Sequence, residues 1–233
     1  MGVKTECAHP LLAPPIKGGE VHKNGEEMNI NGLEIVVFDV ETTGLSPVDG
    51  DRIVEIAAMK VKDLKVVDQF YSLVNPKRFL PAQAMAVNGI TEDMVADAPF
   101  SEHVLPNFID FVGGACVAGH NVKFDLNFVC FELSLLNRKL KEQTPAIDTL
   151  KMARELFPYL STYKLAYLAR ALGISVDQTH RALADVEITV KVMLRLIEKA
   201  QTQDMGKIQK FLTQFCVEKP VFKSSRATES SLF

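Results

Sequence analysis

The stretch VVFDVETTGL, from Val36 to Leu45, ends an apolar run with two carboxylates, Asp39 and Glu41. Side chains two residues apart in a strand point to the same face, so these two acids share one site. Two ionised carboxylates this close repel and raise each other's pKa, unless a cation such as Mg²⁺ or Mn²⁺ lies between them. A solvated turn explains these letters equally well, because Glu-Thr-Thr-Gly is also good turn material.

A second acid follows a short strand in GHNVKFDLNF. His120 and Asn121 close that strand, and Asp125 falls in the first turn of the next helix. Junctions of this kind commonly hold functional groups in α/β folds. A favourable interaction with the helix dipole, worth about 0.3–1 kcal/mol, is the structural alternative for Asp125. That alternative leaves the His-Asn pair unexplained.

The third segment, DQTHRALADVEI, holds His180 and Asp185. Five residues of a continuous α-helix turn through about 500°, so the two side chains would lie about 140° apart. To share a site, His180 must lie on the loop before the helix and Asp185 in its first turns. Asp185 also lies near an apolar stripe, where an acid needs a partner or a metal. A surface or capping role is the alternative for His180.

In this order, VVFDVETTGL, GHNVKFD and HRALAD resemble the three motifs of the DEDDh family of 3′–5′ exonucleases. That group is typified by the proofreading epsilon subunit of bacterial DNA polymerase III. The resemblance runs from about Glu34 to Ala200 and fills every catalytic position of the family. It implies an α/β ribonuclease-H-like fold: a five-stranded mixed sheet flanked by helices, with its first three strands antiparallel.

The resemblance also implies a catalytic set of one histidine and four acids: His180, Asp39, Glu41, Asp125 and Asp185. The acids would hold two divalent cations, Mg²⁺ or Mn²⁺, bridged by Asp39, and His180 would act as the general base. The residues implied in substrate binding are Thr42, Thr43, Gly44, Leu45, Asn88 and Phe124. Asn88 stands where the family often has His, and an amide hydrogen-bonds without carrying charge. Its part in substrate binding is therefore open.

Hydrophobic patterns predict the elements that position these residues. The expected strands are Glu34–Val40, Asp51–Lys62, Lys65–Val74, Ala115–Gly119 and Ala146–Thr149. A tight turn at Asp63-Leu64 would join the second and third strands as a hairpin. The expected helices are a short one within Pro81–Ile90, then Ser101–Val112 with Ser101 as N-cap, Lys123–Leu140, Leu150–Phe157, Tyr163–Leu172, Arg181–Ala200 and 204–215.

The composition, 47% hydrophobic and 24% charged, is that of an ordinary globular protein. We expect one exonuclease domain over 32–202, a flexible leader over 1–31, and a C-terminal helix with a flexible tail over 203–233. No apolar run reaches the roughly 18–20 residues that span a bilayer, and prolines interrupt any N-terminal signal. This pattern predicts a cytoplasmic protein without a membrane partner. The scattered cysteines suggest neither a disulfide framework nor a zinc site.

The expected function is metal-dependent 3′–5′ hydrolysis of single-stranded DNA ends to nucleoside 5′-monophosphates, in proofreading or repair. An RNA-directed exoribonuclease of the same fold is one alternative, since the sequence does not settle tolerance of a 2′-hydroxyl near Glu41 and Thr42. A non-catalytic nucleic-acid-binding scaffold is another, although it needs no converging acids. Expected partners are a single-stranded DNA or RNA 3′ end and a DNA polymerase subunit. The ending ESSLF, Glu229–Phe233, resembles peptides that enter bacterial sliding clamps, or matches them by chance.

Overall fold

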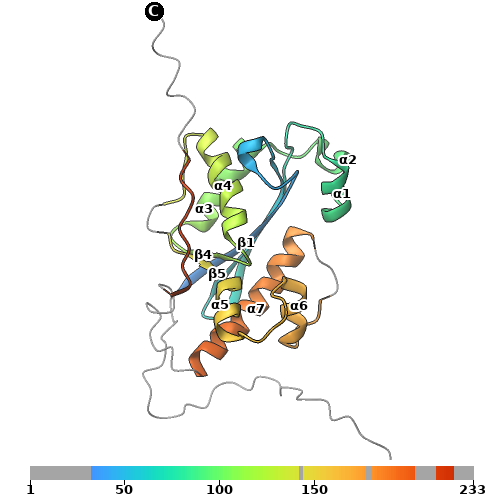
Figure 1. Ribbon diagram of the computed structural model, residues 1–233. Helices are drawn as coiled ribbons and strands as arrows, with labels where there is room; N and C mark the ends of the chain where they lie inside the picture. Colours follow the sequence, from blue (N-terminus) through green and yellow to red (C-terminus); the bar gives the residue numbers. More distant parts are fainter. Residues whose placement is uncertain (1–32, 142–143, 177–179, 203–213, 223–233) are drawn as a thin grey trace, which may run out of the picture.

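A computed structural model describes residues 33–141, 144–176, 180–202 and 214–222 (Figure 1). Its centre is a five-stranded sheet with the order β3-β2-β1-β4-β5. The strands are β1 (Glu34–Thr42), β2 (Ile53–Lys62), β3 (Lys65–Leu73), β4 (Cys116–Gly119) and β5 (Ala146–Asp148). The helices are η1 (Pro47–Asp49, a 3₁₀ turn), α1 (Ala82–Asn88), α2 (Glu92–Ala96), α3 (Ser101–Val112), α4 (Lys123–Leu135), α5 (Thr149–Leu156), α6 (Leu165–Ala171) and α7 (Ala182–Thr202).

The sheet is mixed, as predicted. β1 pairs antiparallel with β2, and β2 pairs antiparallel with β3, whereas β4 runs parallel to both β1 and β5. The predicted turn between β2 and β3 is present at Asp63 and Leu64, whose φ angles of 50° and 60° are both left-handed. Two successive left-handed residues match the twist of a tight hairpin. The predicted fold class, a ribonuclease-H-like α/β domain, is confirmed.

Helices cover both faces of the sheet (Figure 1). Val36, Phe38 and Val40 point into one apolar core with α3 and α4, while Ile35 and Val37 point into the other core with α5, α6 and α7. The alternation along β1 follows the two-residue period of a strand. It therefore directs the next odd-numbered side chains, which are acids, to the side of the sheet that α7 covers.

One helix cap differs from the sequence-based expectation, and one helix end lies more than two residues from its expected place. Ser101 is the first residue of α3 and not its N-cap, which is Phe100. The Ser101 hydroxyl instead accepts a hydrogen bond from Arg52. α4 ends at Leu135, before the predicted Leu140, because Asn137 takes a left-handed φ of 55° and the Arg138 N–H returns to the Leu133 carbonyl. This closure is a Schellman-type helix end.

Two short elements were not predicted, η1 and α2. Each is too short to show an apolar period, so hydrophobic patterning gives no signal for them. The leader over 1–31, most of the helix over 204–215 and the ending Glu229–Phe233 lie outside the described residues. None of the helices in the described part of the chain is long and apolar enough to cross a membrane.

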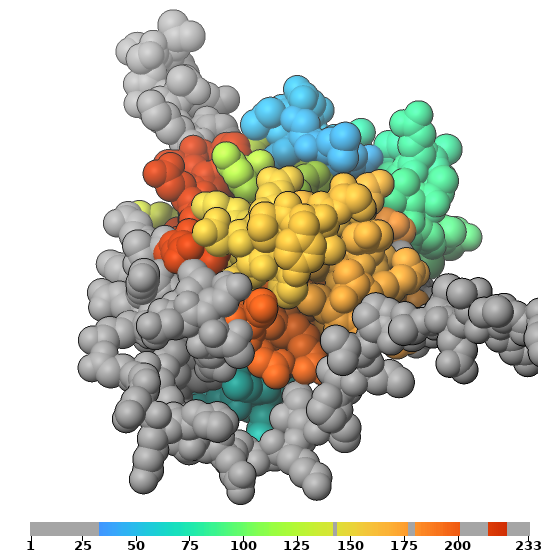
Figure 2. All heavy atoms as spheres, turned by 60° about the horizontal axis from the view of Figure 1, so that its bottom comes forward, coloured from blue at the N-terminus to red at the C-terminus, as the bar shows by residue number. Residues whose placement is uncertain are grey.

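Residues 214–222, here called the C-terminal strap, lie beside β5. Cys216 bridges antiparallel to Ile147, and the Val217 N–H donates to the Ala146 carbonyl at 2.8 Å. At the end of the strap, the Phe222 ring meets Phe131 of α4 edge-on, with 5.3 Å between centroids. Figure 2 shows the strap in red beside the yellow surface around α5. The strap thus covers the β5 edge of the sheet.

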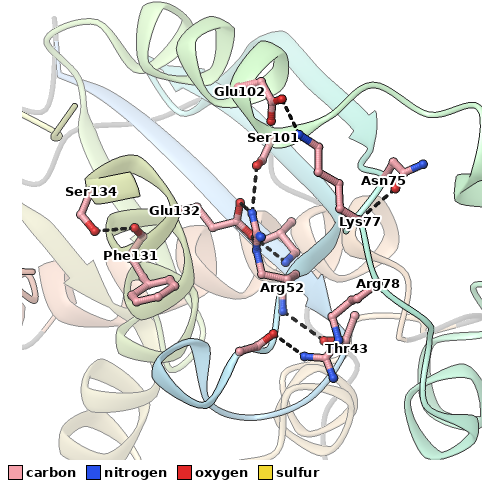
Figure 3. Close-up of polar contacts among 12 residues, drawn as sticks. Thr43, Arg52, Asn75, Lys77, Arg78, Ser101, Glu102, Phe131, Glu132 and Ser134 are labelled. Atoms are coloured by element: carbon pink, nitrogen blue, oxygen red, sulfur yellow. Dashed lines mark hydrogen bonds and ion pairs between the residues drawn. The ribbon is translucent and has the colours of Figure 1, made fainter. Parts of the chain in front are cut away.

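An ion pair between β2 and α4 fixes that helix to the sheet (Figure 3). The guanidinium of Arg52, just before β2, donates to both oxygens of Glu132, at 3.0 and 2.8 Å. Only 1% of the Glu132 side chain is exposed, and one of its oxygens also accepts the Ile53 N–H at 3.0 Å. A buried carboxylate with this many donors is satisfied, but it depends on its arginine.

Replacing Arg52 by alanine should therefore lower the free energy of unfolding by about 3–5 kcal/mol, because Glu132 would stay buried without its cation. Urea denaturation monitored by circular dichroism measures the change. Arg195→Ala is the matched control, since it breaks a surface pair with Glu198 whose side chains are 37% and 58% exposed. The control should cost about 0.3–0.5 kcal/mol. Equal losses in both variants would contradict the argument.

Candidate active site

Three carboxylates converge where β1 ends. Asp39 and Glu41 lie two residues apart on β1, and Asp185 lies in the first turn of α7, which packs across β1 and β2. One carboxylate oxygen from each residue lies within 4.8 Å of the others. This cluster is the acidic site that the spacing of the β1 acids predicts, and three such oxygens can hold a metal ion.

Asp125 approaches the same strand end from α4. It is 3% exposed, and its Oδ1 accepts the backbone N–H of Val40 at 3.0 Å. The pairing of β1 with β4 ends at Val37 and Ala118, so the carboxylate meets β1 directly beyond the last strand pair. Asp125 is thus in the first helical turn, where the sequence placed it, and its charge acts on Asp39. It is not part of the 4.8 Å cluster of three oxygens.

His180 lies before α7, as the spacing argument requires. Its φ of 63° is left-handed, which is uncommon for a residue with a Cβ. Its backbone N–H donates to Asp185 Oδ2 at 3.0 Å, and the residue is exposed. The histidine and the α7 carboxylate are thereby held at the same end of the helix.

Burial makes these carboxylates hard to ionise. It raises the pKa of Asp39 and Asp125 well above the usual range, and neighbouring carboxylates add to the effect. Burial and then the charge of Asp185 raise the pKa of Glu41 to about 7, and burial likewise raises the pKa of Asp185. The charge of Arg181 offsets only part of the rise for Glu41, so these acids ionise readily only when further positive charge lies near them.

One carboxylate oxygen of the site, Asp185 Oδ1, is buried and is left without a hydrogen-bond donor among the described residues. An unsatisfied buried carboxylate oxygen costs free energy unless a cation or donor meets it. Its place in the three-acid cluster fits a divalent cation, whose preferred ligands are carboxylate oxygens.

The turn after β1 is held by internal hydrogen bonds. The Thr42 hydroxyl donates to the Gly44 carbonyl at 2.6 Å, and the Thr43 hydroxyl donates to Asp51 at 3.2 Å. A Cβ on Gly44 would collide with the Asp51 carboxylate, so a larger residue there would displace that side chain. Leu45 follows and is 84% exposed. The turn therefore presents an apolar side chain to solvent on a fixed backbone.

The other two expected substrate-binding residues are less exposed. Asn88, at the end of α1, is 4% exposed; its Nδ2 lies 3.5 Å from the Thr42 carbonyl and its Oδ1 accepts the Ile90 N–H. Its hydrogen bond to Glu41 partly offsets the rise in that carboxylate's pKa. Phe124, at the start of α4, is partly buried, with its ring 5.2 Å from that of Phe128.

Sequence reasoning missed Glu55 and Arg181, which form a buried ion pair beside the site. A signal for Glu55 was available, because it interrupts the apolar run of RIVEIAAM in a buried strand. An acid in such a run needs a partner. The identity of that partner, 126 residues away, is not visible in the sequence.

His120, which the sequence analysis singled out, has a structural role. Its ring lies 3.0 Å from the Thr149 hydroxyl and 2.7 Å from the Tyr163 carbonyl, and burial lowers its pKa. These contacts join the end of β4 to α5 and to the segment before α6. They explain the histidine at the strand end without a catalytic role.

Comparison with known proteins agrees with this geometry. Residues 36–193 match the family model described as Exonuclease (RNase_T). The chain belongs to this exonuclease family. The matched range includes both acids of β1, Asp125, His180 and Asp185, and the predicted resemblance to DEDDh 3′–5′ exonucleases is confirmed. The expectation that the chain is an enzyme of this class is confirmed with it.

Several relatives match this chain over a short part of a much longer protein. The PolC-type DNA polymerase III of Caldanaerobacter subterraneus subsp. tengcongensis is 39% identical over 187 residues, which cover 80% of this chain and 13% of that protein. The 3′–5′ exonuclease DinG of Bacillus subtilis is 36% identical over 170 residues, covering 73% and 18%. The chain thus spans less than a fifth of the length of these relatives.

Solved structures show the same fold. Exonuclease X, in complex with 5′ overhanging duplex DNA, superimposes with a TM-score of 0.57 and 32% identity, covering 71% of this chain and 92% of that one. Exonuclease I has a TM-score of 0.65 at 22% identity, over 74% and 42% of the two chains. The second likeness shows the fold alone.

The raised pKa of Glu41 predicts how stability depends on pH without metal. Its ordinary value is 4.5 and its folded value is about 7, so the folded state binds the extra proton. Protonation of Glu41 therefore contributes to the free energy of unfolding in full below about pH 4.5, and this contribution is lost as the pH rises through about 7. In EDTA, the Tm should therefore fall between about pH 5 and 8, and Mg²⁺ should raise it more at pH 8 than at pH 5.

Differential scanning fluorimetry at these pH values measures the effect. Glu41→Gln cannot ionise, so its Tm in EDTA should fall less steeply with pH than that of the unaltered chain. A variant slope as steep as the original would mean that Glu41 does not titrate in this window.

Proposed function

We propose that this domain is a metal-dependent 3′–5′ exonuclease that removes nucleoside 5′-monophosphates from single-stranded DNA ends during proofreading or repair. The observation that carries the proposal is the cluster of Asp39, Glu41 and Asp185, with an unsatisfied Asp185 oxygen, beside an exposed histidine. Family membership supports the reaction class. The resemblance to polymerases of PolC type supports a role near replication.

Asp39, Glu41 and Asp185 would hold two divalent cations, Mg²⁺ or Mn²⁺, together with Asp125. Such ions supply activation of a water, neutralisation of phosphate charge and stabilisation of the leaving 3′-oxygen. Asp125 would contribute from the first turn of α4, where the Val40 N–H holds its Oδ1. The carboxylates keep their ionised form once cations balance their charge.

The chain's own side chains perform the remaining steps. His180, exposed just before α7, accepts the proton of the attacking water at its imidazole, a role that histidine side chains commonly fill. Leu45 packs against the terminal base with Phe124 nearby. Apolar contacts and stacking recognise a base without reading its identity, which suits an enzyme that degrades any single strand.

DNA is the favoured substrate because the relatives include DNA polymerases and exonuclease X was solved with DNA. An RNA-directed exoribonuclease and a non-catalytic scaffold are the other outcomes of the test. Labelled DNA and RNA strands of one sequence, incubated with Mg²⁺ or with EDTA, distinguish the three. Faster loss of the RNA 3′ end would reassign the substrate, and binding without cleavage would indicate a scaffold.

We also propose a DNA polymerase subunit and a sliding clamp as partners, and a cytoplasmic location. The clamp segment, Glu229–Phe233, lies outside the described residues. Phe233 is eleven residues along the chain from Phe222, which packs on α4, and such a segment reaches at most about 40 Å. Binding through it would keep the exonuclease domain at high effective concentration near a primer end.

Asp39→Ala should abolish hydrolysis, because the remaining acids cannot hold two cations in register. Binding of a fluorescent single strand, measured by anisotropy, should largely survive. Asp110→Ala, an exposed acid on α3, is the matched control and should keep full activity. Near-normal turnover by Asp39→Ala would rule out the two-cation proposal.

His180→Ala should slow turnover by about 10²–10⁴-fold, the usual contribution of a positioned base. Metal affinity, followed by calorimetry with Mn²⁺, should change little, and the loss of rate should shrink at high pH, where hydroxide competes. His103→Ala, on the exposed side of α3, controls for loss of an imidazole. A collapse of Mn²⁺ affinity would instead make His180 a ligand.

A peptide of residues 220–233 should bind a bacterial sliding clamp, and the same peptide with Leu232→Ala and Phe233→Ala should not. Insertion of two terminal apolar side chains into a pocket is the physical basis of this difference. Fluorescence polarisation with purified clamp measures both affinities. Equal, millimolar-weak binding by the two peptides would leave a free-standing exonuclease.

A further inference from the structure

Strand β2 carries a carboxylate, Glu55, that lies next to the candidate active site on the same face of the sheet. Glu55 pairs across the sheet with Glu41, so both side chains lie on the face that α7 covers. Glu55 is 0% exposed and is distinct from the three-acid cluster. An ionised carboxylate at such a position must be fully hydrogen-bonded.

The partners of Glu55 lie at the start of α7. Its Oε1 accepts Arg181 Nη2 at 2.6 Å and Nε at 3.1 Å, and its Oε2 accepts the Ala182 backbone N–H at 2.8 Å. The Tyr71 hydroxyl of β3 also donates to Oε1 at 2.9 Å. One buried carboxylate therefore fixes both a side chain and a backbone amide of the residues that directly follow His180.

The segment from His180 to Asp185 is consequently held at two points. Glu55 accepts hydrogen bonds from the Arg181 side chain and the Ala182 backbone N–H. Asp185 Oδ2 accepts the backbone N–H of His180. The His180 backbone is left-handed, a conformation that needs support from its surroundings. Because the histidine itself is exposed, its position depends on the backbone more than on packing of its ring.

We propose that Glu55, acting through Arg181 and Ala182, is the positioning residue that sets His180 over the reacting phosphate. The inference rests on the base role of His180 in the proposed function. Glu55 touches no substrate in this scheme. It keeps the first turn of α7 and the residue before it in one geometry relative to β1.

The chain offers well-matched variants for a test. Glu55→Gln keeps the shape of the side chain but weakens the bidentate pair. Arg181→Lys keeps the positive charge but loses the planar guanidinium, whose Nε and Nη2 both donate to the Glu55 carboxylate. Arg181 also lines a surface hollow of about 400 Å³, so a lysine there stays hydrated and the fold should be retained. Glu187→Gln, exposed on the same helix, is the control.

A double-mutant cycle separates positioning of His180 from a general structural effect. Single-turnover rates and KM on a labelled single-stranded DNA would be measured with Mg²⁺ for Glu55→Gln, His180→Ala and the double variant. Glu55→Gln should slow the chemical step by about 10²-fold with KM nearly unchanged, the usual cost of a misplacement near 1 Å. In the His180→Ala background the same change should cost less than about threefold. Glu187→Gln should match the unaltered chain.

Equal fold losses in both backgrounds would overturn the inference, and so would a Glu55→Gln rate equal to that of Glu187→Gln. If thermal melting shows that Glu55→Gln does not fold, Arg181→Lys takes its place in the cycle with the same expected outcome. Absence of hydrolysis by the unaltered chain would contradict the proposed function, and the inference with it. Additive losses on an active chain contradict the inference alone.

Discussion

Mutual repulsion of partly buried carboxylates at the end of β1 is the constraint around which this domain is organised. Asp39, Glu41 and Asp185 approach within 4.8 Å, and burial raises their pKa values. Because like charges at this distance repel, a rigid backbone is needed to hold these side chains together. β1 supplies that rigidity, because it is the central strand of the sheet and apolar cores lie on both of its faces.

Strand β2 holds the two helices that bring further acids to β1. Just before the strand begins, Arg52 binds Glu132 of α4, the helix that carries Asp125. Three residues later, Glu55 binds Arg181, which directly precedes α7, the helix that carries Asp185. Each pair joins one almost fully buried carboxylate to a less buried guanidinium. Buried pairs of this kind add little net stability over apolar packing, but breaking one is costly. Their value here is in fixing geometry.

Sequence alone predicted the elements that have a clear period. The odd and even residues of β1 separate into two cores as alternation requires, and the Asp63-Leu64 turn follows from hairpin spacing. Exact helix ends depend on single hydrogen bonds, such as the one from Arg138 to Leu133, which no period reveals. The candidate catalytic acids were visible because three motifs occur in order. The Glu55 interaction was not, because its arginine lies 126 residues away in the chain.

The C-terminal strap has a consequence for aggregation. An unpaired strand edge is a template on which a second molecule can add its own strand. At one edge of the sheet, β3 bears charged side chains such as Lys65 and Asp68, which disfavour that pairing. At the other edge, β5 is entirely buried and apolar but for its last residue, and the Cys216–Val217 backbone covers it. A chain cut after α7 would keep every acid of the candidate active site but would leave the β5 edge unpaired, so we expect it to aggregate more readily than a chain that includes the strap.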